Sequence, residues 1–315
     1  MQMKPLGATP LQVSTVGIGC MNFGTMCDQA ATDAIVATAL DAGVNLFDVA
    51  DIYGGRMGVS EGMLGRALGD RRRDVVIATK FGAKLGGGGG SAPGGGSRDY
   101  ITAAVEASLT ALGTDYIDLY QHHFPDAGTP VEETLRALDE LVRSGKVRYV
   151  GCSNYSGAQL AAALDAAADL GLARFATAQN RYSLITRDIE RDLVPVCTAR
   201  RVSVLPYFPL ESGLLSGKYR QGEPLPAGSR FAKWRGGGTF ASEARYALVE
   251  RLRAWGEARG VGVLDIAMGW LASRPWVGSV IAGVTRPEQV TANVAAAAFA
   301  PDAAADREID ALIAG

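Results

Sequence analysis

The chain has 315 residues, 48% of them hydrophobic, so it is long and apolar enough to bury a large core. Its 31 Lys and Arg against 33 Asp and Glu give a formal net charge of -2, which argues against a nucleic-acid surface and a polybasic membrane anchor. No apolar run approaches the roughly 18 residues of a membrane span, and the amino terminus lacks the apolar core of a signal peptide.

A hairpin is predicted first, over residues 3–15, and short apolar runs then alternate with helical patterns. We expect strands near 16–19, 44–47, 75–80, 116–121, 147–152, 175–179, 202–207 and 277–282. We expect helices near 30–41, 60–68 with Ser60 as its cap, 99–112, 130–144, 156–170, 187–200, 242–259, 263–273 and 287–298. Eight strand–helix pairs indicate an α/β fold, a (β/α)8 TIM barrel forming a single domain over 1–315, with long loops at its carboxyl-terminal face. A doubly wound sheet is the alternative.

Polar residues follow three consecutive predicted strands. Asp48 closes the second strand and Tyr53 lies in the loop after it, Lys80 ends the third strand, and His122 and His123 follow the fourth. The carboxyl ends of barrel strands face the active site, so we expect these side chains to meet there. A free phenol has a pKa of about 10, which a nearby cation such as Lys80 would lower, and this suggests proton chemistry. Taken singly, each polar residue could simply end its strand.

The motifs FDVADIYG (47–54), IATKFG (77–82) and DLYQHHFPD (118–126) resemble the aldo-keto reductase family, and the resemblance extends over essentially the whole chain. It implies NADPH-dependent reduction of an aldehyde or ketone to an alcohol. Tyr53 would donate the proton, Lys80 would lower the pKa of the phenol, and Asp48 would fix Lys80. His123 would orient the carbonyl, because family members place the histidine two residues before the proline and only one of two adjacent strand residues can point inward.

No GxGxxG motif of the Rossmann type is present, so a dinucleotide would have to be held in another way. Neutral polar side chains at the ends of later strands could do this. They lie in segments that resemble the family's GxSN, glutamine-strand and aromatic-x-Pro-Leu segments. By this resemblance Ser153, Asn154 and Gln179 hold the nicotinamide carboxamide and Tyr207 stacks on the ring. The expected site also includes Asp48, Phe208, Pro209 and Leu210. The alternative for Ser153 and Asn154 is an ordinary helix cap.

The segment 283–293 resembles the family's adenosine-phosphate site, in which a loop enters a helix whose amino terminus favours phosphate. Arg286 would grip a 2′-phosphate and so favour NADPH over NADH, while Gln289 and Asn293 would face adenine. The expected set also includes Gly283 and Thr285, whereas Ala292 stands where related sequences often place glutamate.

The long connection 211–240 resembles a branch with bacterial long-loop reductases and potassium-channel β subunits, where its counterpart folds over the pyrophosphate. Lys218 and Ser229-Arg230 would do so here. A solvated basic loop is the alternative.

Several functional questions stay open from the sequence. Lys80 could form a Schiff base, as in lysine-dependent aldolases, and the likeness to channel subunits allows an NADPH-binding redox-sensing partner with little turnover. The glycine-rich connection 82–97 fits either a lid or a tolerated insertion. The expected partner is a small-molecule carbonyl compound, with no nucleic acid, membrane or metal, and the oligomeric state is undetermined.

Aromatic residues near the predicted barrel mouth suggest an apolar or aromatic-lined substrate pocket, unless most of them pack against the core beneath the loops. These residues are Phe23, Phe81, Phe124, Phe208 and Trp234. The four cysteines show no CxxC or metal-binding spacing, which suits a reducing compartment, so we expect a cytoplasmic protein.

Overall fold

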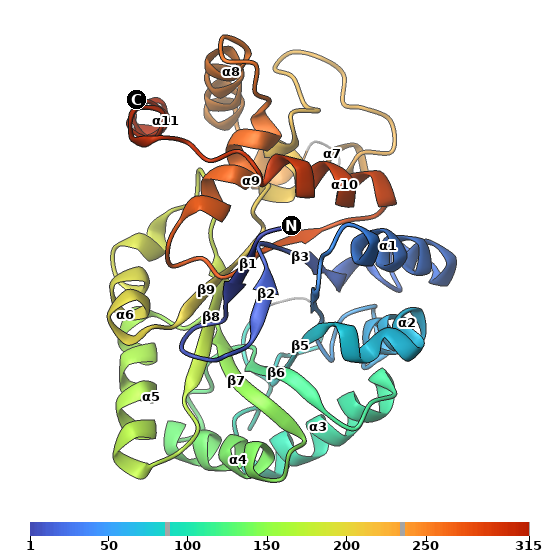
Figure 1. Cartoon of the computed structure of the whole chain (residues 1–315), viewed down its shortest axis with the longest axis vertical. Helices are drawn as coiled ribbons and strands as arrows, with labels where there is room; N and C mark the ends of the chain where they lie inside the picture. The colour runs from blue at the N-terminus through green and yellow to red at the C-terminus, as the bar shows by residue number, and fades with distance from the viewer. Residues whose placement is uncertain (86–88, 234–236, 315) are drawn as a thin grey trace.

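Parallel strands form the centre of the molecule (Figure 1). The computed structural model describes residues 1–85, 89–233 and 237–314. In this part of the chain an eight-stranded sheet runs in the order β10-β3-β4-β5-β6-β7-β8-β9. The strands are β3 (Val16–Gly19), β4 (Leu46–Asp48), β5 (Val76–Phe81), β6 (Ile117–His122), β7 (Val147–Ser153), β8 (Phe175–Arg181), β9 (Ser203–Tyr207) and β10 (Val280–Gly283). A parallel bridge between Val204 and Val277 brings the two edges together. The predicted (β/α)8 barrel is therefore confirmed, and the doubly wound sheet is excluded.

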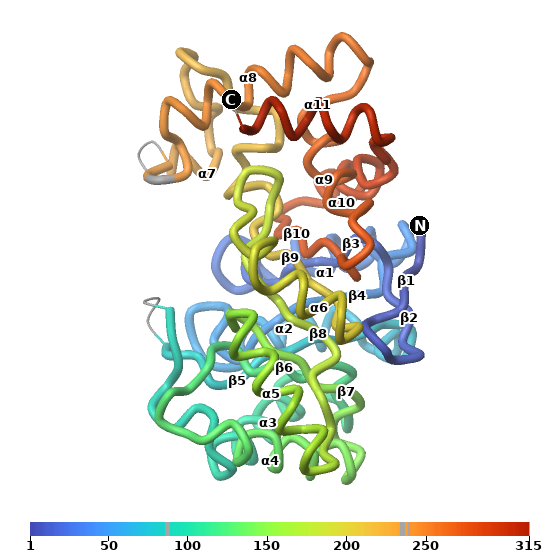
Figure 2. Tube along the Cα trace, turned by 90° about the vertical axis from the view of Figure 1, so that its left-hand side faces the viewer, coloured from blue at the N-terminus to red at the C-terminus, as the bar shows by residue number. Residues whose placement is uncertain are grey.

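Helices surround the barrel and cover the outer face of the strands (Figures 1 and 2). They are α1 (Gln29–Asp41), α2 (Val59–Leu68), α3 (Arg98–Leu112), α4 (Val131–Arg143), α5 (Gly157–Leu170), α6 (Leu193–Arg200), α7 (Arg230–Lys233), α8 (Glu243–Glu257), α9 (Val263–Ser273), α10 (Pro287–Ala296) and α11 (Ala303–Ala314). Figures 1 and 2 show α8 and α11 at the end of the molecule furthest from α3 and α4. None of the helices described is both long and apolar enough to cross a membrane.

The predicted hairpin covers the amino-terminal end of the barrel. It consists of β1 (Met3–Pro5) and β2 (Gln12–Ser14), paired antiparallel. Leu6 and Val13 from the hairpin share a buried apolar cluster with residues of the barrel strands: Leu46, Val76, Ala78, Leu119, Leu205 and Ile281. Because this cluster fills the interior at that end, the opposite end, where the strands finish, is left for a site.

Two local predictions need correction, and one helix was missed. Helix α2 begins at Val59 after Gly58, whose φ of 74° suits glycine, so Ser60 is not its cap. Ser60 instead donates a hydrogen bond to the carbonyl oxygen of Cys20 at 2.8 Å. The helix predicted over 187–200 is split, because a 3-10 turn at Asp188–Glu190 precedes α6. Helix α11 was not predicted at all.

Candidate active site

A buried ion pair lies where β4 and β5 end. Lys80 places its Nζ 2.7 Å from Oδ2 of Asp48 and donates a second hydrogen bond to the carbonyl oxygen of Val49 at 3.0 Å. Burial lowers the pKa of Lys80, but the charges and hydrogen bonds of Asp48 and Tyr53 outweigh it, so the net pKa is raised. Lys80 therefore carries its charge at neutral pH although no part of its side chain is exposed.

Tyr53 reaches the same ammonium group from the loop after β4. Its hydroxyl oxygen lies 3.4 Å from Nζ of Lys80, and that nitrogen is 4.9 Å from the ring centroid. Gly54 follows with a φ of 95°, and a Cβ there would meet the side chain of Val59 at 2.8 Å, so the turn that presents the phenol requires glycine.

The pKa of Tyr53 does not follow the prediction. Burial raises it, and the charge of Lys80 offsets only part of that effect, so the net pKa lies above the usual value for a phenol. The expectation of a lowered pKa is wrong because it omitted the desolvation of the ring. The phenol stays protonated at neutral pH, which is the form that a proton donor needs.

The two adjacent histidines point in different directions. The ring of His123 meets the ring of Tyr53 edge-on, with centroids 5.9 Å apart. The ring of His122 stacks on Phe81 at 5.1 Å, and its Nδ1 lies 2.8 Å from the hydroxyl of Tyr155. Burial and the charge of Lys80 hold the pKa of His123 well below its ordinary value, so this imidazole is neutral. His123 is therefore the histidine brought to Tyr53, and His122 packs beneath.

Two glutamines hold the second oxygen of Asp48. Nε2 of Gln179, on β8, lies 2.7 Å from Oδ1, and Nε2 of Gln121, on β6, lies 3.4 Å from it. Gln121 was not predicted, although it stands directly before His122 in the motif at 118–126. Asp48 is thus oriented through both of its oxygens, and its orientation fixes that of Lys80.

A hydrogen-bonded chain continues from Gln179 to the ends of β7 and β9. Ser153 donates to the carbonyl oxygen of Gln179 at 2.8 Å, and Asn154 donates to Ser153 and to the carbonyl oxygen of His123. The hydroxyl of Tyr207 donates to Oδ1 of Asn154 at 2.7 Å. The four residues predicted to contact the carboxamide and the ring of nicotinamide therefore lie next to one another.

The interpretation of Ser153 and Asn154 as a helix cap is wrong. Helix α5 is capped by Ser156, in a reciprocal arrangement with Gln159.

The segment after β9 is held in an unusual backbone conformation. Phe208, Glu211 and Ser212 all have positive φ values, of 54°, 45° and 58°. The ring of Phe208 contacts that of Tyr207 edge-on at 5.4 Å, Pro209 is buried and Leu210 is partly buried.

Glu211 anchors this strained turn, and no sequence motif predicted this role. Its carboxylate is buried and accepts hydrogen bonds from Arg181, Ser183 and Arg245. Burial would raise the pKa of Glu211, but these donors outweigh it and lower the pKa.

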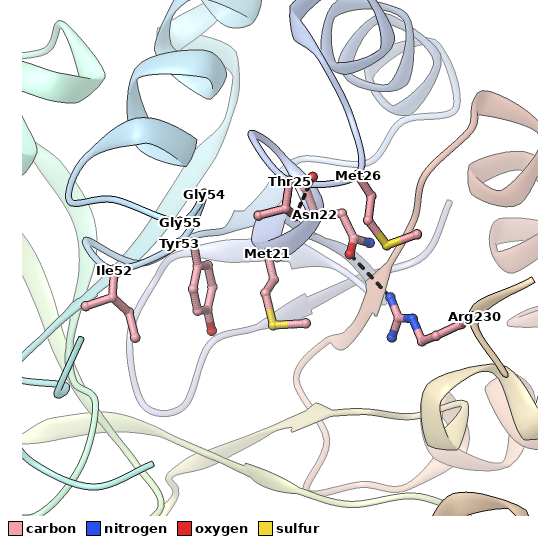
Figure 3. A pocket seen from close by; sticks show the side chains of 9 residues that line it. All are labelled: Met21, Asn22, Thr25, Met26, Ile52, Tyr53, Gly54, Gly55 and Arg230. Atoms are coloured by element: carbon pink, nitrogen blue, oxygen red, sulfur yellow. Dashed lines mark hydrogen bonds between the residues drawn. The ribbon is translucent and has the colours of Figure 1, made fainter. Parts of the chain in front are cut away.

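A pocket of about 300 Å³ opens beside Tyr53 (Figure 3). It is lined by Met21, Asn22, Thr25, Met26, Ile52, Tyr53, Gly54, Gly55 and Arg230. Arg230 donates to Oδ1 of Asn22 at 3.3 Å, and Asn22 donates to the carbonyl oxygen of Val284 at 2.9 Å. The long connection 211–240 therefore meets the loops after β3 and β10 at this pocket. Lys218 does not line it, and its ammonium lies 5.1 Å from the centroid of the Tyr219 ring.

The pocket has apolar side chains, as one of the two expected forms would, but the predicted phenylalanines do not supply them. Phe23 and Phe81 are fully buried in the core, and neither Phe124 nor Phe208 lines the pocket. Trp234 lies outside the described residues. The competing view, that these rings pack beneath the loops, is correct for Phe23 and Phe81.

The segment predicted to bind adenosine phosphate runs from the end of β10 into α10. Arg286 is the exposed residue before α10, and within 1–85, 89–233 and 237–314 its guanidinium makes no hydrogen bond or ion pair. Oε1 of Gln289 accepts from the backbone and hydroxyl of Thr285, at 2.7 and 3.2 Å. Gly283 ends β10, and Asn293 is buried on α10. A cation at the amino terminus of a ten-residue helix suits a phosphate group.

Two further acidic residues are buried near Lys80. Asp51 is buried, and neither of its carboxylate oxygens has a hydrogen-bond partner among the described residues. Glu61, on α2, accepts from the hydroxyl of Thr79 at 2.6 Å. Burial and the neighbouring charge of Glu61 raise the pKa of Asp51 to about 7. No role was predicted for Asp51, although it lies in the same motif as Asp48 and Tyr53.

The glycine-rich connection 82–97 is partly fixed by its own hydrogen bonds. Ala83 and Ser91 form an antiparallel bridge, and the backbone N–H of Ala92 donates to the carbonyl oxygen of Gly82 at 2.8 Å. Residues 86–88 lie outside the described residues. The two interpretations of this connection, as a lid and as an insertion, both remain predictions.

Comparison with known proteins places nearly the whole chain among one set of relatives. The sequence model described as the Aldo/keto reductase family matches residues 15–314. The chain is 36% identical over 311 residues to a probable voltage-gated potassium channel subunit beta of Arabidopsis thaliana, covering 96% of this chain and 92% of that one. It is 32% identical over 307 residues to L-glyceraldehyde 3-phosphate reductase of Escherichia coli (strain K12), covering 94% and 87%. It is 33% identical over 314 residues to the uncharacterized oxidoreductase YrpG of Bacillus subtilis (strain 168), covering 96% and 93%.

Proposed function

Because the chain belongs to the aldo/keto reductase family of oxidoreductases, we propose that it reduces an aldehyde or ketone to an alcohol with NADPH as its cofactor. One observation carries the proposal. The phenol of Tyr53 lies 3.4 Å from a fully buried, charged Lys80, beside a neutral His123 and an open pocket. A proton donor, a cation and a hydrogen-bonding group at one cavity are what carbonyl reduction requires of the protein.

Each side chain has a distinct role in this proposal. Tyr53 gives its hydroxyl proton to the carbonyl oxygen, and the charge of Lys80 stabilises the phenolate that remains. Asp48 keeps Lys80 protonated and in place. His123 holds the carbonyl oxygen toward Tyr53, which is a contribution of orientation. When bound, NADPH supplies the hydride that the carbonyl carbon receives.

The chain offers groups for both ends of the cofactor. Ser153, Asn154 and Gln179 would hold the carboxamide, and Tyr207 would stack on the ring, with Phe208, Pro209 and Leu210 beside it. Arg230 and Lys218 would meet the pyrophosphate. Arg286 would bind the 2′-phosphate, and the adenosine end would also be held by Gly283, Thr285, Gln289 and Asn293. The fit is supported by the hydrogen-bonded cluster next to Tyr53 and by the guanidinium at the start of α10, which has no hydrogen-bond or ion-pair partner in the part of the chain that the structure describes.

The test is NADPH consumption against a panel of aldehydes and ketones, with NADH at equal concentration as the comparison. We expect consumption that depends on the carbonyl compound and is faster with NADPH. An absence of consumption across the panel, together with no calorimetric binding of either dinucleotide, would contradict the proposal.

Two other functions make different predictions. A Schiff base at Lys80 requires a neutral amine, whereas Asp48 holds Lys80 in its charged form, so borohydride should trap no substrate on this residue. The similarity to a plant potassium channel subunit favours a partner subunit that binds NADPH but turns over slowly. Calorimetric binding of NADPH without consumption across the panel would favour that function over ours.

A further inference from the structure

The sulfur atoms of this chain divide into a protected set and an exposed set. All four cysteines are buried, and burial raises the pKa of every thiol, that of Cys197 to about 12. Since the thiolate is the form that oxidants attack, these cysteines are poor targets. Sulfur oxidation in the folded chain should therefore fall on methionine.

The seven methionines differ widely in exposure. Met63 and Met268 are 6% and 0% exposed. Met21 and Met26 are 40% and 42% exposed and line the pocket beside Tyr53. Met57 is 50% exposed and does not line it, while Met1 and Met3 lie at the amino terminus. Two of the accessible thioethers are thus in the candidate active site.

Figure 3 shows how these two side chains lie. Met21 and Tyr53 extend from neighbouring loops into the same space, and Met26 lies on the side of Arg230. The remaining side chain of clearly apolar character is Ile52. The thioethers are therefore two of the three aliphatic side chains of this lining, next to the proton donor of the proposed function.

We propose that Met21 and Met26 are a site of reversible oxidation whose sulfoxides weaken binding of carbonyl substrates. With hydrogen peroxide, an S=O bond forms as the O–O bond breaks, the sulfur loses two electrons, and the peroxide is reduced to water. The product places a strong dipole where the pocket wall was apolar, and covering that dipole with a substrate leaves it without water. The effect on turnover rests on the proposed function, but the oxidation itself and ligand binding do not.

The test begins with the intact chain and hydrogen peroxide. Peptide mass spectrometry should find sulfoxide at residues 21 and 26, together with the other exposed methionines, well before residues 63 and 268 and before any thiol is oxidised. Binding of benzaldehyde, followed by saturation-transfer NMR, should weaken about tenfold in the oxidised protein. The KM for a carbonyl substrate should rise by a similar factor, with a smaller change in kcat.

Matched variants assign the effect. A Met21→Leu/Met26→Leu double variant should keep its benzaldehyde affinity after peroxide, whereas Met57→Leu should lose affinity as the unmodified sequence does. Methionine sulfoxide reductases should restore binding. Unchanged affinity with residues 21 and 26 fully oxidised would overturn the inference, as would equal loss in the double variant. Benzaldehyde binding without any NADPH consumption would instead point to failure of the proposed function.

Discussion

Lys80 is charged although its side chain has no exposed surface, and its ion-pair partner Asp48 explains how the charge is stabilised. The ion pair with Asp48 is itself supported by Gln179 and Gln121, so the carboxylate has hydrogen bonds at both oxygens. A buried pair of this kind costs desolvation that its own attraction barely repays. Its retention here fits a functional role, because the same ammonium group lies next to Tyr53.

Replacing Lys80 with methionine tests this pair. Lys80→Met leaves the carboxylate of Asp48 buried without its cation, so we expect a loss of about 3–5 kcal/mol in the free energy of unfolding, measured by urea denaturation. The double variant Lys80→Met/Asp48→Asn should recover most of that stability and none of the NADPH consumption. Equal stability of the single variant and the unmodified sequence would show that the pair is not the buried contact described.

The raised pKa of Asp51 predicts that the stability of the chain depends on pH. Its pKa in the folded chain is about 7 against 3.8 for an ordinary aspartate, so between these values the folded state keeps a proton that the unfolded state has lost. The free energy of unfolding should therefore fall as pH rises from about 4 to about 7 and level off above that.

Asp51→Asn should reduce this slope and stabilise the chain at pH 8 by about 4 kcal/mol. Part of the slope should remain, since burial also raises the pKa of Glu61. Urea denaturation at pH 5 and pH 8 measures both. Asp70→Asn, which removes an exposed carboxylate, is the control, and an identical slope in the two variants would refute the role of Asp51.

At the scale of elements, the strands could be predicted because most are short runs of apolar residues, and several have polar residues at or just after their ends. Asp48 closes β4 as predicted, and Lys80 and His122 lie at or beside the ends of β5 and β6. Parallel strands bring these ends to one edge, so neighbours in the candidate site could be predicted from strand ends alone.

Features that depend on packing could not be predicted in this way. The start of α2 at Gly58 depends on a left-handed backbone, while Ser60 offered a familiar cap signal. Glu211 is anchored by Arg181 and Arg245, which are far from it in the sequence. The net pKa of Tyr53 depends on burial, which no strand-end motif records.

Helix α10 gives a prediction of its own. If Arg286 binds the 2′-phosphate, Arg286→Ala should weaken NADPH binding about tenfold or more, because a charge-assisted hydrogen bond is lost, and should leave NADH binding unchanged. Calorimetry with both dinucleotides measures this. Arg307→Ala, which removes an exposed arginine from α11, is the control. A parallel loss for NADPH and NADH would argue against a role in cofactor choice.

At the scale of the whole molecule, the two ends of the barrel differ: one end is packed with apolar side chains, and the other carries the candidate active site. The hairpin and its apolar cluster fill the amino-terminal end, while loops after β3, β4 and β10 meet the long connection at the other end. Residues as distant in the sequence as Asn22 and Arg230 therefore lie against one pocket (Figure 3). In the proposed function, this one sheet would carry the groups for a substrate and for both ends of a dinucleotide.

The substitution Tyr53→Phe removes one oxygen atom and keeps the ring. The measurement is a single turnover with a carbonyl substrate, alongside calorimetric binding of NADPH to the same preparation. We predict reduction slowed by about a hundredfold to ten-thousandfold, the usual contribution of a positioned proton donor, with NADPH affinity changed less than about twofold. Reduction at the rate of the unmodified sequence would contradict the assignment of Tyr53 as the proton donor.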